Sequence, residues 1–542
     1  MCVDDRVREV SIVPTGKVAR GPQGRIRGAA LLALLAIGAG GSAHARDWPM
    51  FGQGLGNSAS TPSDVTRANV GSLSPKWVFT TGGDVSARAA VAGGTAYFPD
   101  WGGNLWAVNA SNGKKVWSHQ FSDYFGDAVH RNSRTTPAVV KGVLYTATQE
   151  GAWLLAINAS NGRLLWKTQL ESVDPFAIVS SSPAVAGGVV FTGVASTEEA
   201  AVAPPPFGGN YPCCSARGSA VAVNAATGAI LWKTYTVPPG YSGASVWGSN
   251  PVLDVARNSV FVGTGNNFSH ANDPLYQACI AVPGATESSC LSPDDHVDSI
   301  LALDMTTGAI KWSQRLVNWN QPYLGIVDGS DAWNVACFFG PVPNCPAQPG
   351  PDYDFGSGPN EITYQTPSGA RTIIGAGQKS GIYYALDPDL GTVLWSTQVG
   401  PGSAFGGIEW GSASDGVRIY VAIANFYGLP NNAGGAAGSW AALDPATGAI
   451  LWQVPDPNGA IDLGPLAVSN GIVYASSMSG AAGAPTMLAL DGANGNRLWS
   501  YAAGSSVNCG ATVVDGTVFW GSGYSHVPLP GFTGNNKFYA FR

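Results

Sequence analysis

Carboxylate and amide side chains gather in parts of this 542-residue chain that otherwise hold small and apolar residues. Glu198 and Glu199 stand in a run of Ala, Pro and Gly, Asn266 and Asn267 end an apolar run, and Asp331 is followed by Ala-Trp. Carboxylate and amide oxygens are the ligands that hard cations prefer. Singly, each of these residues also fits a solvated loop. Together they predict an all-oxygen cation site, provided that the fold brings them to one place.

A cation and a flat aromatic ring accompany these groups. Lys379, in the run Gln-Lys-Ser-Gly, is the cation, and Trp247 offers a π-face or, alternatively, is a packing residue. The adjacent Cys213 and Cys214 form either a strained disulfide with a raised reduction potential or two cysteines with separate roles. The sequence contains no metal-hydrolase, P-loop, catalytic-triad or C-x-x-C-H haem signature.

The N-terminus has the pattern of a signal peptide. Basic residues precede a short apolar run over 29–38, and Ser-Ala-His-Ala ends at Ala45. We therefore expect residues 1–45 to be removed on export, with an uncleaved anchor as the alternative. Later apolar stretches are too short to cross a bilayer, so we expect no membrane span in the mature chain and a periplasmic or secreted location.

Cysteine spacing agrees with export. The close pairs Cys279/Cys290 and Cys337/Cys345 predict disulfides that staple loops in an oxidising compartment, whereas Cys509 is predicted to be unpaired.

Composition indicates an all-β protein. Charged residues make up only 12% of the chain, and Gly (72 residues) and Trp (18 residues) are abundant, as in short strands joined by tight turns. The net charge of −7 argues against a nucleic-acid partner, because phosphate binding requires Lys and Arg.

A repeat defines the predicted architecture. The pattern A-x-[N/D]-x3-G-x3-W begins at 107, 156, 222, 302, 385, 442 and 489. Each copy describes a β-hairpin whose Asn or Asp caps the turn and whose Gly adopts a positive φ. A second hairpin precedes most copies, so each unit holds four antiparallel strands and must stack on its neighbours to bury both faces.

An eighth copy is divided between the two ends of the chain. The first half of the pattern is represented by 538–542 and the second half by Lys76-Trp77-Val78-Phe79. Joining these halves predicts a closed eight-bladed β-propeller over 46–542 that leaves no long exposed edge. An open solenoid is the alternative, but it leaves the divided copy unexplained.

Three long insertions fall on one face of this propeller. In chain order, the segments of about 196–218 and 266–299 join the second and third strands of a blade, and about 318–361 joins two blades. The pattern turns lie on the opposite face and are short. Long loops on one rim of a rigid scaffold usually carry function, and they hold most of the residues singled out above.

The blades and loops resemble the pyrroloquinoline quinone (PQQ)-dependent alcohol dehydrogenases, and most closely the polyvinyl alcohol dehydrogenase branch. The segments that carry the resemblance run across nearly the whole chain from position 48. They are Trp48-Pro-Met-Phe-Gly, Tyr211-Pro-Cys-Cys-Ser-Ala-Arg-Gly, Tyr241-Ser-Gly-Ala-Ser-Val-Trp-Gly, Gly263-Thr-Gly-Asn-Asn, Gly350-Pro-Asp-Tyr-Asp-Phe-Gly, Gln378-Lys-Ser-Gly, Gly406-Gly-Ile-Glu-Trp-Gly and Gly521-Ser-Gly-Tyr.

The resemblance implies a calcium site and a base. Glu198 is similar to the calcium-binding glutamate of the family, with Glu199 as a close competitor, and Asn266 is similar to the calcium-binding asparagine. Asp331 is similar to the catalytic aspartate, which also contacts the metal.

The resemblance also implies a binding site for PQQ. Lys379 looks like the basic residue at the quinone oxygens and has a catalytic role as well. The cofactor-binding residues implied are Trp247, Lys379, Arg217, Arg134, Cys213 and Cys214. Two departures stand out. The cysteine pair follows the glutamate loop instead of preceding it, and Glu409 replaces an Asn that relatives usually carry before Trp410.

The activity implied is PQQ- and Ca²⁺-dependent oxidation of secondary alcohols, such as polyvinyl alcohol, to ketones. Because the chain has no haem segment, electrons are expected to pass to a separate periplasmic cytochrome c. Two alternatives remain open: a propeller without cofactor that acts as an envelope scaffold, and a PQQ enzyme for a small primary alcohol or polyol.

Overall fold

The computed structural model describes residues 47–129, 131–202, 211, 214–248, 250–269, 273–316, 350–527, 529 and 531–542. The predicted leader, 1–45, lies outside these residues. In the described part of the chain no helix is long and apolar enough to cross a membrane.

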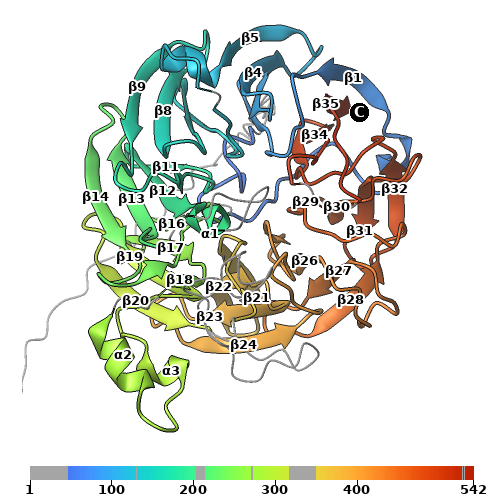
Figure 1. Cartoon of the computed structure of the whole chain (residues 1–542). Coiled ribbons are helices and arrows are strands. Elements are labelled where there is room, and N and C mark those ends of the chain that lie inside the picture. The colour runs from blue at the N-terminus through green and yellow to red at the C-terminus, as the bar shows by residue number, and fades with distance from the viewer. Residues whose placement is uncertain are drawn as a thin grey trace, which may run out of the picture. The chain divides into compact units, whose positions relative to one another are not determined.

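In the described residues, eight antiparallel sheets with four blade strands each follow one another along the chain, and β10 (Ala177–Ile178) adds a fifth strand to the sheet of β12 (Val189–Ser196) (Figure 1). Their strands, from the innermost outward, are as follows: β2 (Ala90–Ala92), β3 (Thr95–Pro99), β4 (Asn104–Asn109) and β5 (Lys115–Gln120); β6 (Ala138–Val140), β7 (Val143–Ala147), β8 (Trp153–Asn158) and β9 (Leu164–Gln169); β11 (Ala184–Ala186), β12 (Val189–Ser196), β13 (Ser219–Asn224) and β14 (Ile230–Tyr235); β16 (Val252–Asp254), β17 (Ser259–Gly263), β19 (Ser299–Asp304) and β20 (Ile310–Arg315); β21 (Asn360–Thr366), β22 (Gly369–Gly377), β23 (Ile382–Leu386) and β24 (Val393–Gln398); β25 (Ala413–Ser414), β26 (Ile419–Ile423), β27 (Ser439–Leu443) and β28 (Ile450–Pro455); β29 (Ala467–Ser469), β30 (Ile472–Ser476), β31 (Met487–Asp491) and β32 (Arg497–Tyr501); and β33 (Thr512–Val514), β34 (Thr517–Gly521), β35 (Lys537–Phe541) and β1 (Pro75–Thr80).

The sheets form a closed ring. Each innermost strand contacts the innermost strand of the next sheet, and β33 of the last sheet contacts β2 of the first. The last sheet is completed by β1, which pairs with β35 in an antiparallel register that places Val78 opposite Tyr539. The predicted eight-bladed propeller, with its divided eighth blade, is therefore confirmed.

The tryptophans of the repeat connect neighbouring blades. The indole N–H of each donates to a backbone carbonyl of the next blade or of the segment beside it, at 2.8 to 3.2 Å. The donors and acceptors are Trp77 and Ala110, Trp117 and Ala159, Trp166 and Ala225, Trp232 and Met305, Trp312 and Pro388, Trp395 and Pro445, Trp452 and Gly492, and Trp499 and Leu73. Trp77 thus takes the place of the eighth tryptophan.

The glycine of the repeat has two functions in this contact. Gly228 has a φ of +77°, and a Cβ atom placed on it would lie 2.7 Å from ring atoms of Trp166 in the preceding blade. The same relation joins Gly308 to Trp232 and Gly448 to Trp395. The pattern therefore encodes both the turn and the surface on which the neighbouring indole rests.

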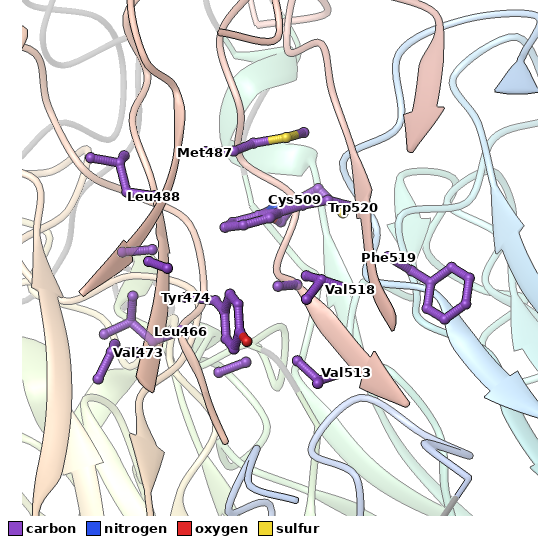
Figure 2. Packing of buried hydrophobic residues seen from close by; sticks show 14 of the residues in the cluster. Leu466, Val473, Tyr474, Met487, Leu488, Cys509, Val513, Val518, Phe519 and Trp520 are labelled. Atoms are coloured by element: carbon purple, nitrogen blue, oxygen red, sulfur yellow. The ribbon is translucent and has the colours of Figure 1, made fainter. Parts of the chain in front are cut away.

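Apolar side chains fill the space between the sheets. Figure 2 shows this packing around β30 and β34, where Tyr474 and Trp520 meet with their rings 6.3 Å apart. Cys509 lies in this core, and its carbonyl accepts the indole N–H of Trp520 at 2.6 Å. Its thiol is free and buried, which confirms the prediction for this cysteine.

The long insertions carry the additional short elements. Between β12 and β13 lies α1 (Glu198–Ala201), and β10 (Ala177–Ile178) pairs with the end of β12. Between β17 and β19 the chain forms β18 (Asn267–Ser269), α2 (Pro274–Ile280) and α3 (Glu287–Cys290), and β18 pairs with β15 (Ser242–Gly243). Helices α2 and α3 lie outside the ring of sheets (Figure 1). The short 3-10 turns are η1 (Val70–Ser72) and η2 (Phe121–Tyr124).

One of the two predicted loop disulfides is present: Cys279 is bonded to Cys290. The pair Cys337/Cys345 lies outside the described residues.

The contact between blades predicts the effect of a single methyl group. We expect Gly228→Ala to lower the free energy of unfolding by about 2 kcal/mol or more, because the new Cβ meets both a positive φ and the Trp166 ring. Gly188→Ala is the matched control, since Gly188 has a φ of +81° with nothing within 4 Å of its Cβ position. Thermal unfolding of both variants measures the difference, and equal losses would contradict this role of the indole contact.

Candidate functional site

A cavity of about 160 Å³ lies on the face that carries the long insertions. Its walls come from segments that lead into innermost strands, from α1, from the end of β12, from β18 and from the connection between β22 and β23. The charged and aromatic residues among its lining are Arg134, Glu199, Trp247, Phe268, Asp354 and Lys379. Because these segments adjoin the innermost strands, residues more than 200 positions apart meet in one place.

Lys379 lies between two carboxylates. Its Nζ is 3.1 Å from Oδ2 of Asp352 and 3.6 Å from Oδ2 of Asp354. Burial alone lowers the pKa of Lys379, but Asp352 and Asp354 raise it, and the net pKa lies well above its ordinary value. Burial and the Asp354 carboxylate raise the pKa of Asp352. The lysine therefore stays a cation inside the cavity.

Asp354 is fixed from two sides. The indole N–H of Trp247 donates to its Oδ2 at 2.8 Å, and the backbone N–H of Asn266 donates to its Oδ1 at 3.0 Å. Lys379 lies over the Trp247 ring, with Nζ 5.0 Å from the ring centroid. The segment that leads into β21 carries Asp354 and through it contacts both Trp247 and Lys379. The backbone N–H of Lys379 donates to the carbonyl of Asp354 at 2.9 Å.

The two adjacent glutamates of α1 have different surroundings. The Glu198 carboxylate accepts the backbone N–H groups of Ser215 at 2.8 Å and Ala216 at 2.7 Å, so it anchors the segment after the cysteine pair. Glu199 lines the cavity, and its Oε2 is buried without a hydrogen-bond partner. Burial and Asp354 raise the pKa of Glu199 to about 8, although Lys379 acts in the opposite direction. Of the two, Glu199 presents an oxygen for a ligand.

Glu409 adds another buried carboxyl group. Its Oε2 has no hydrogen-bond partner, and burial raises its pKa to about 7, against the lowering effects of Lys379 and Arg134. The neighbouring Trp410 meets the Trp247 ring edge-on at 5.2 Å and supports the Arg134 guanidinium, 3.8 Å above its ring. The residue that departs from relatives therefore belongs to the surroundings of the cavity.

The other residues predicted to bind the cofactor or to act in catalysis are not among the described residues that line the cavity. Arg217 donates through Nε to the Val237 carbonyl at 3.0 Å and lies over the Tyr235 ring, and it is not among the described lining residues. Cys214 is disulfide-bonded, whereas Cys213 and Asp331 lie outside the described residues. The structure thus brings Trp247, Lys379 and Arg134 together.

Asp352 and Asp354 are site residues that were not predicted from the sequence. Both belong to Gly350-Pro-Asp-Tyr-Asp-Phe-Gly, a segment that supported the resemblance without an assigned function. The available signal was two carboxylates two positions apart in a Pro- and Gly-rich segment just before an innermost strand.

The oxygen atoms and the excess of carboxyl groups around the cavity suit the binding of a hard cation. Glu199, Asp352, Asp354 and Glu409 surround the two cations Lys379 and Arg134, so carboxyl groups are in excess. The partnerless Glu199 oxygen faces the same cavity as Asp354. In the described residues, however, no three His, Cys, Asp or Glu side chains are already grouped as a metal site. A bound ion would therefore need further oxygens from amides, water or the ligand.

An eight-bladed propeller with this buried cluster has the fold of the quinoprotein alcohol dehydrogenases. The quinohemoprotein alcohol dehydrogenase from Comamonas testosteroni superposes with a TM-score of 0.66 at 17% identity, covering 92% of this chain and 80% of that one. Residues 57–204 and 378–523, more than half of the chain, match the family described as "Outer membrane protein assembly factor BamB", and the chain belongs to this family.

Two relatives of known name are similar over most of the sequence. Polyvinylalcohol dehydrogenase from a Pseudomonas species is 28% identical over 524 residues, which cover 88% of this chain and 73% of the relative. The enzyme of the same name from Sphingopyxis sp. (strain 113P3) is 28% identical over 513 residues, which cover 84% and 69%. These findings confirm the resemblance predicted from the sequence.

The raised pKa of Glu409 predicts a stability that depends on pH. The ordinary pKa of this group is 4.5, so between pH 4.5 and about 7 the folded chain retains a proton that the unfolded chain has lost, and stability falls as the pH rises. Glu409→Gln removes this cost. We expect the cofactor-free variant to gain up to about 3 kcal/mol over the parent at pH 8 and little at pH 4. Thermal unfolding across this range is the measurement, and a gain of equal size at both pH values would contradict the assignment.

Proposed function

We propose that the protein is a quinoprotein alcohol dehydrogenase that oxidises a secondary alcohol, with polyvinyl alcohol as the favoured substrate, to a ketone. The observation that carries this proposal is the arrangement of Asp354 beside the buried cation Lys379. The Asp354 carboxylate is fixed by the indole N–H of Trp247 and the backbone N–H of Asn266. The names of the two relatives support the substrate class.

The residues of the cavity fit PQQ and a divalent cation such as Ca²⁺. When bound, the quinone accepts a hydride equivalent and the ion polarises its carbonyl group. Glu199 and Asp354 would hold the ion, with Asn266 as the neighbouring amide, and the face of Trp247 would support the planar ring. This ligand set places Glu199 in the role first given to Glu198.

Asp354 is proposed as the general base. A carboxylate with one oxygen held by an indole N–H and the other by an amide N–H has a fixed direction toward the substrate hydroxyl, whose proton it accepts. Lys379 stabilises negative charge that develops on an oxygen in the cavity, as a fixed cation in a dry site does best. Asp354 thereby takes the role that sequence analysis gave to Asp331.

Electrons are proposed to leave to a separate periplasmic cytochrome c. The solved relative is a quinohemoprotein by its title, whereas this sequence carries no C-x-x-C-H motif. A leader over 1–45, as proposed from the sequence, supports a reaction in the periplasm beside such an acceptor.

An envelope scaffold is the second candidate, and the description of the matching family favours it. A scaffold requires the ring of blades but no buried lysine between carboxylates. Because buried charge is costly, its presence in the cavity supports the enzyme.

The proposed base is tested by Asp354→Asn. Because Asp354 is also a proposed ligand, the variant is loaded with PQQ at saturating Ca²⁺. It is expected to retain the quinone absorbance but to reduce an artificial dye, with a secondary alcohol as substrate, about 10²- to 10⁴-fold more slowly. Asp331→Asn is the matched control and is expected to keep its turnover. Loss of turnover in Asp331→Asn alone would restore the original assignment, and no alcohol-dependent dye reduction by the parent would favour the scaffold.

The proposed ligand is tested by comparing the two glutamates. Glu199→Gln is expected to weaken Ca²⁺ binding at least about tenfold, because it removes a carboxylate from the cavity. Glu198→Gln is expected to leave the Ca²⁺ affinity unchanged and to lower stability by about 1–3 kcal/mol through weaker bonds to Ser215 and Ala216. Calorimetric titration and thermal unfolding separate the two effects. Weaker binding only in the Glu198 variant would reverse the assignment.

A further inference from the structure

Arg88 is a buried guanidinium group close to the candidate site. It is only 1% exposed, Nη1 donates to the Phe51 carbonyl and Nη2 to the Leu466 carbonyl, each at 2.7 Å, and Nε has no hydrogen-bond partner. Within the described part of the chain, no carboxylate lies within ion-pair distance of it. Nη2 also lies 3.3 Å from the Pro465 carbonyl, and Cζ lies 5.3 and 4.9 Å from the centroids of the Trp48 and Phe51 rings. Carbonyl groups and aromatic faces supply partial charges only, so Arg88 has no full counter-charge of the kind that buried ions normally have.

A small hollow of about 30 Å³ adjoins this guanidinium. Its polar lining comprises Arg88, Arg134, Ser86, Thr136, Ser182 and Asn508, and no Asp or Glu is among its described lining residues. Oγ1 of Thr136 and Oδ1 of Asn508 are buried in it without hydrogen-bond partners. The volume accommodates about two water-sized ligands. Two cations and several hydroxyl groups therefore converge on a space that only a small ligand can enter.

We propose that this hollow binds one monovalent anion of halide size, with Arg88 and the Thr136 hydroxyl as its donors. A water molecule beside the anion donates to Oδ1 of Asn508, which satisfies the third partnerless atom. Two features select this ligand. The charge of the lining excludes cations, and its volume excludes polyatomic anions such as sulfate.

The hollow is linked to the larger cavity through shared residues. Arg134 and Ser180 line both spaces, and Arg134 rests on the ring of Trp410, which also lines the hollow. An anion in the hollow supplies negative charge near Arg88 and Arg134, which both line it, in a region of low dielectric constant. Anion binding is therefore expected to stabilise the fold and to hold Arg134 at the wall of the site.

Bromide provides a direct test with the unmodified chain. Crystals of the cofactor-free protein grown with bromide are expected to show an anomalous bromine peak in the hollow, within hydrogen-bond distance of Nε of Arg88. A second data set with PQQ and Ca²⁺ shows whether cofactor and halide bind together. A peak that persists supports a halide site separate from the cofactor, as the volume of the hollow requires, and a peak lost on loading would contradict that separation. Absence of the peak from the cofactor-free protein would overturn the proposal.

Thermal unfolding gives an independent readout. At a chloride concentration of about 100 times Kd, the melting temperature is expected to exceed that in sodium gluconate of equal ionic strength by about 2–3 °C. Thr136→Val is expected to lose most of this shift. Thr192→Val is the matched control, because this buried threonine does not line the hollow and donates to the Ser181 carbonyl at 2.8 Å. Equal chloride shifts in both variants and the parent would contradict the assignment of Thr136 as a donor.

Discussion

The contact between an indole and the next blade is the interaction on which the rest of the structure depends. Each repeat tryptophan donates to a carbonyl beyond its own sheet, and in most blades it also rests on a glycine whose positive φ makes the turn. The same glycine makes the turn and contacts the indole, so each copy of the pattern determines both its own hairpin and the packing of that hairpin on the preceding blade. Trp499 reaches the Leu73 carbonyl and Trp77 the Ala110 carbonyl, so the series closes across the two ends of the chain. The closed, densely packed ring that follows keeps the two aspartate carboxyl groups beside Lys379 close together.

The fold was predictable because its information is local and repeated. The spacing of Ala, Gly and Trp within one hairpin reports the turn, and the number of copies reports the number of blades. The divided copy was also visible, since strand β1 carries the tryptophan half and strand β35 the alanine half. Pairing of Cys279 with Cys290 followed from short spacing. None of these inferences needed the direction of an individual side chain in a loop.

Residues of the site were predictable only where a charged or large aromatic residue stands in a segment of mostly small and uncharged residues. Lys379 and Trp247 stood out as a cation and a large ring, and both line the cavity. The choice between Glu198 and Glu199 depends on the rotation of one short helical turn, in which adjacent residues point about 100° apart, and spacing alone does not report that rotation. The contact of Arg217 could not be foreseen for a related reason. Its guanidinium meets the Val237 carbonyl within its own blade, a contact that only the folded loop creates.

A topological rule explains where many residues of the two spaces lie, predicted and missed alike. The segments that lead into the innermost strands deliver Arg88, Arg134, Trp247, Asp354 and Asn508 to the centre of the ring, although the segments differ in length and sequence. Each is close to its neighbours in space because the innermost strands touch, so charges of both signs accumulate without any local pattern in the sequence. In the folded ring, the carboxylates and the second group of cations lie in two different spaces. Carboxylates gather around Lys379, while Arg88 and the hydroxyl groups gather in the hollow beside it. Because buried charge is costly, each excess of charge favours a ligand of opposite sign, and the hard cation and the small anion proposed above have these signs.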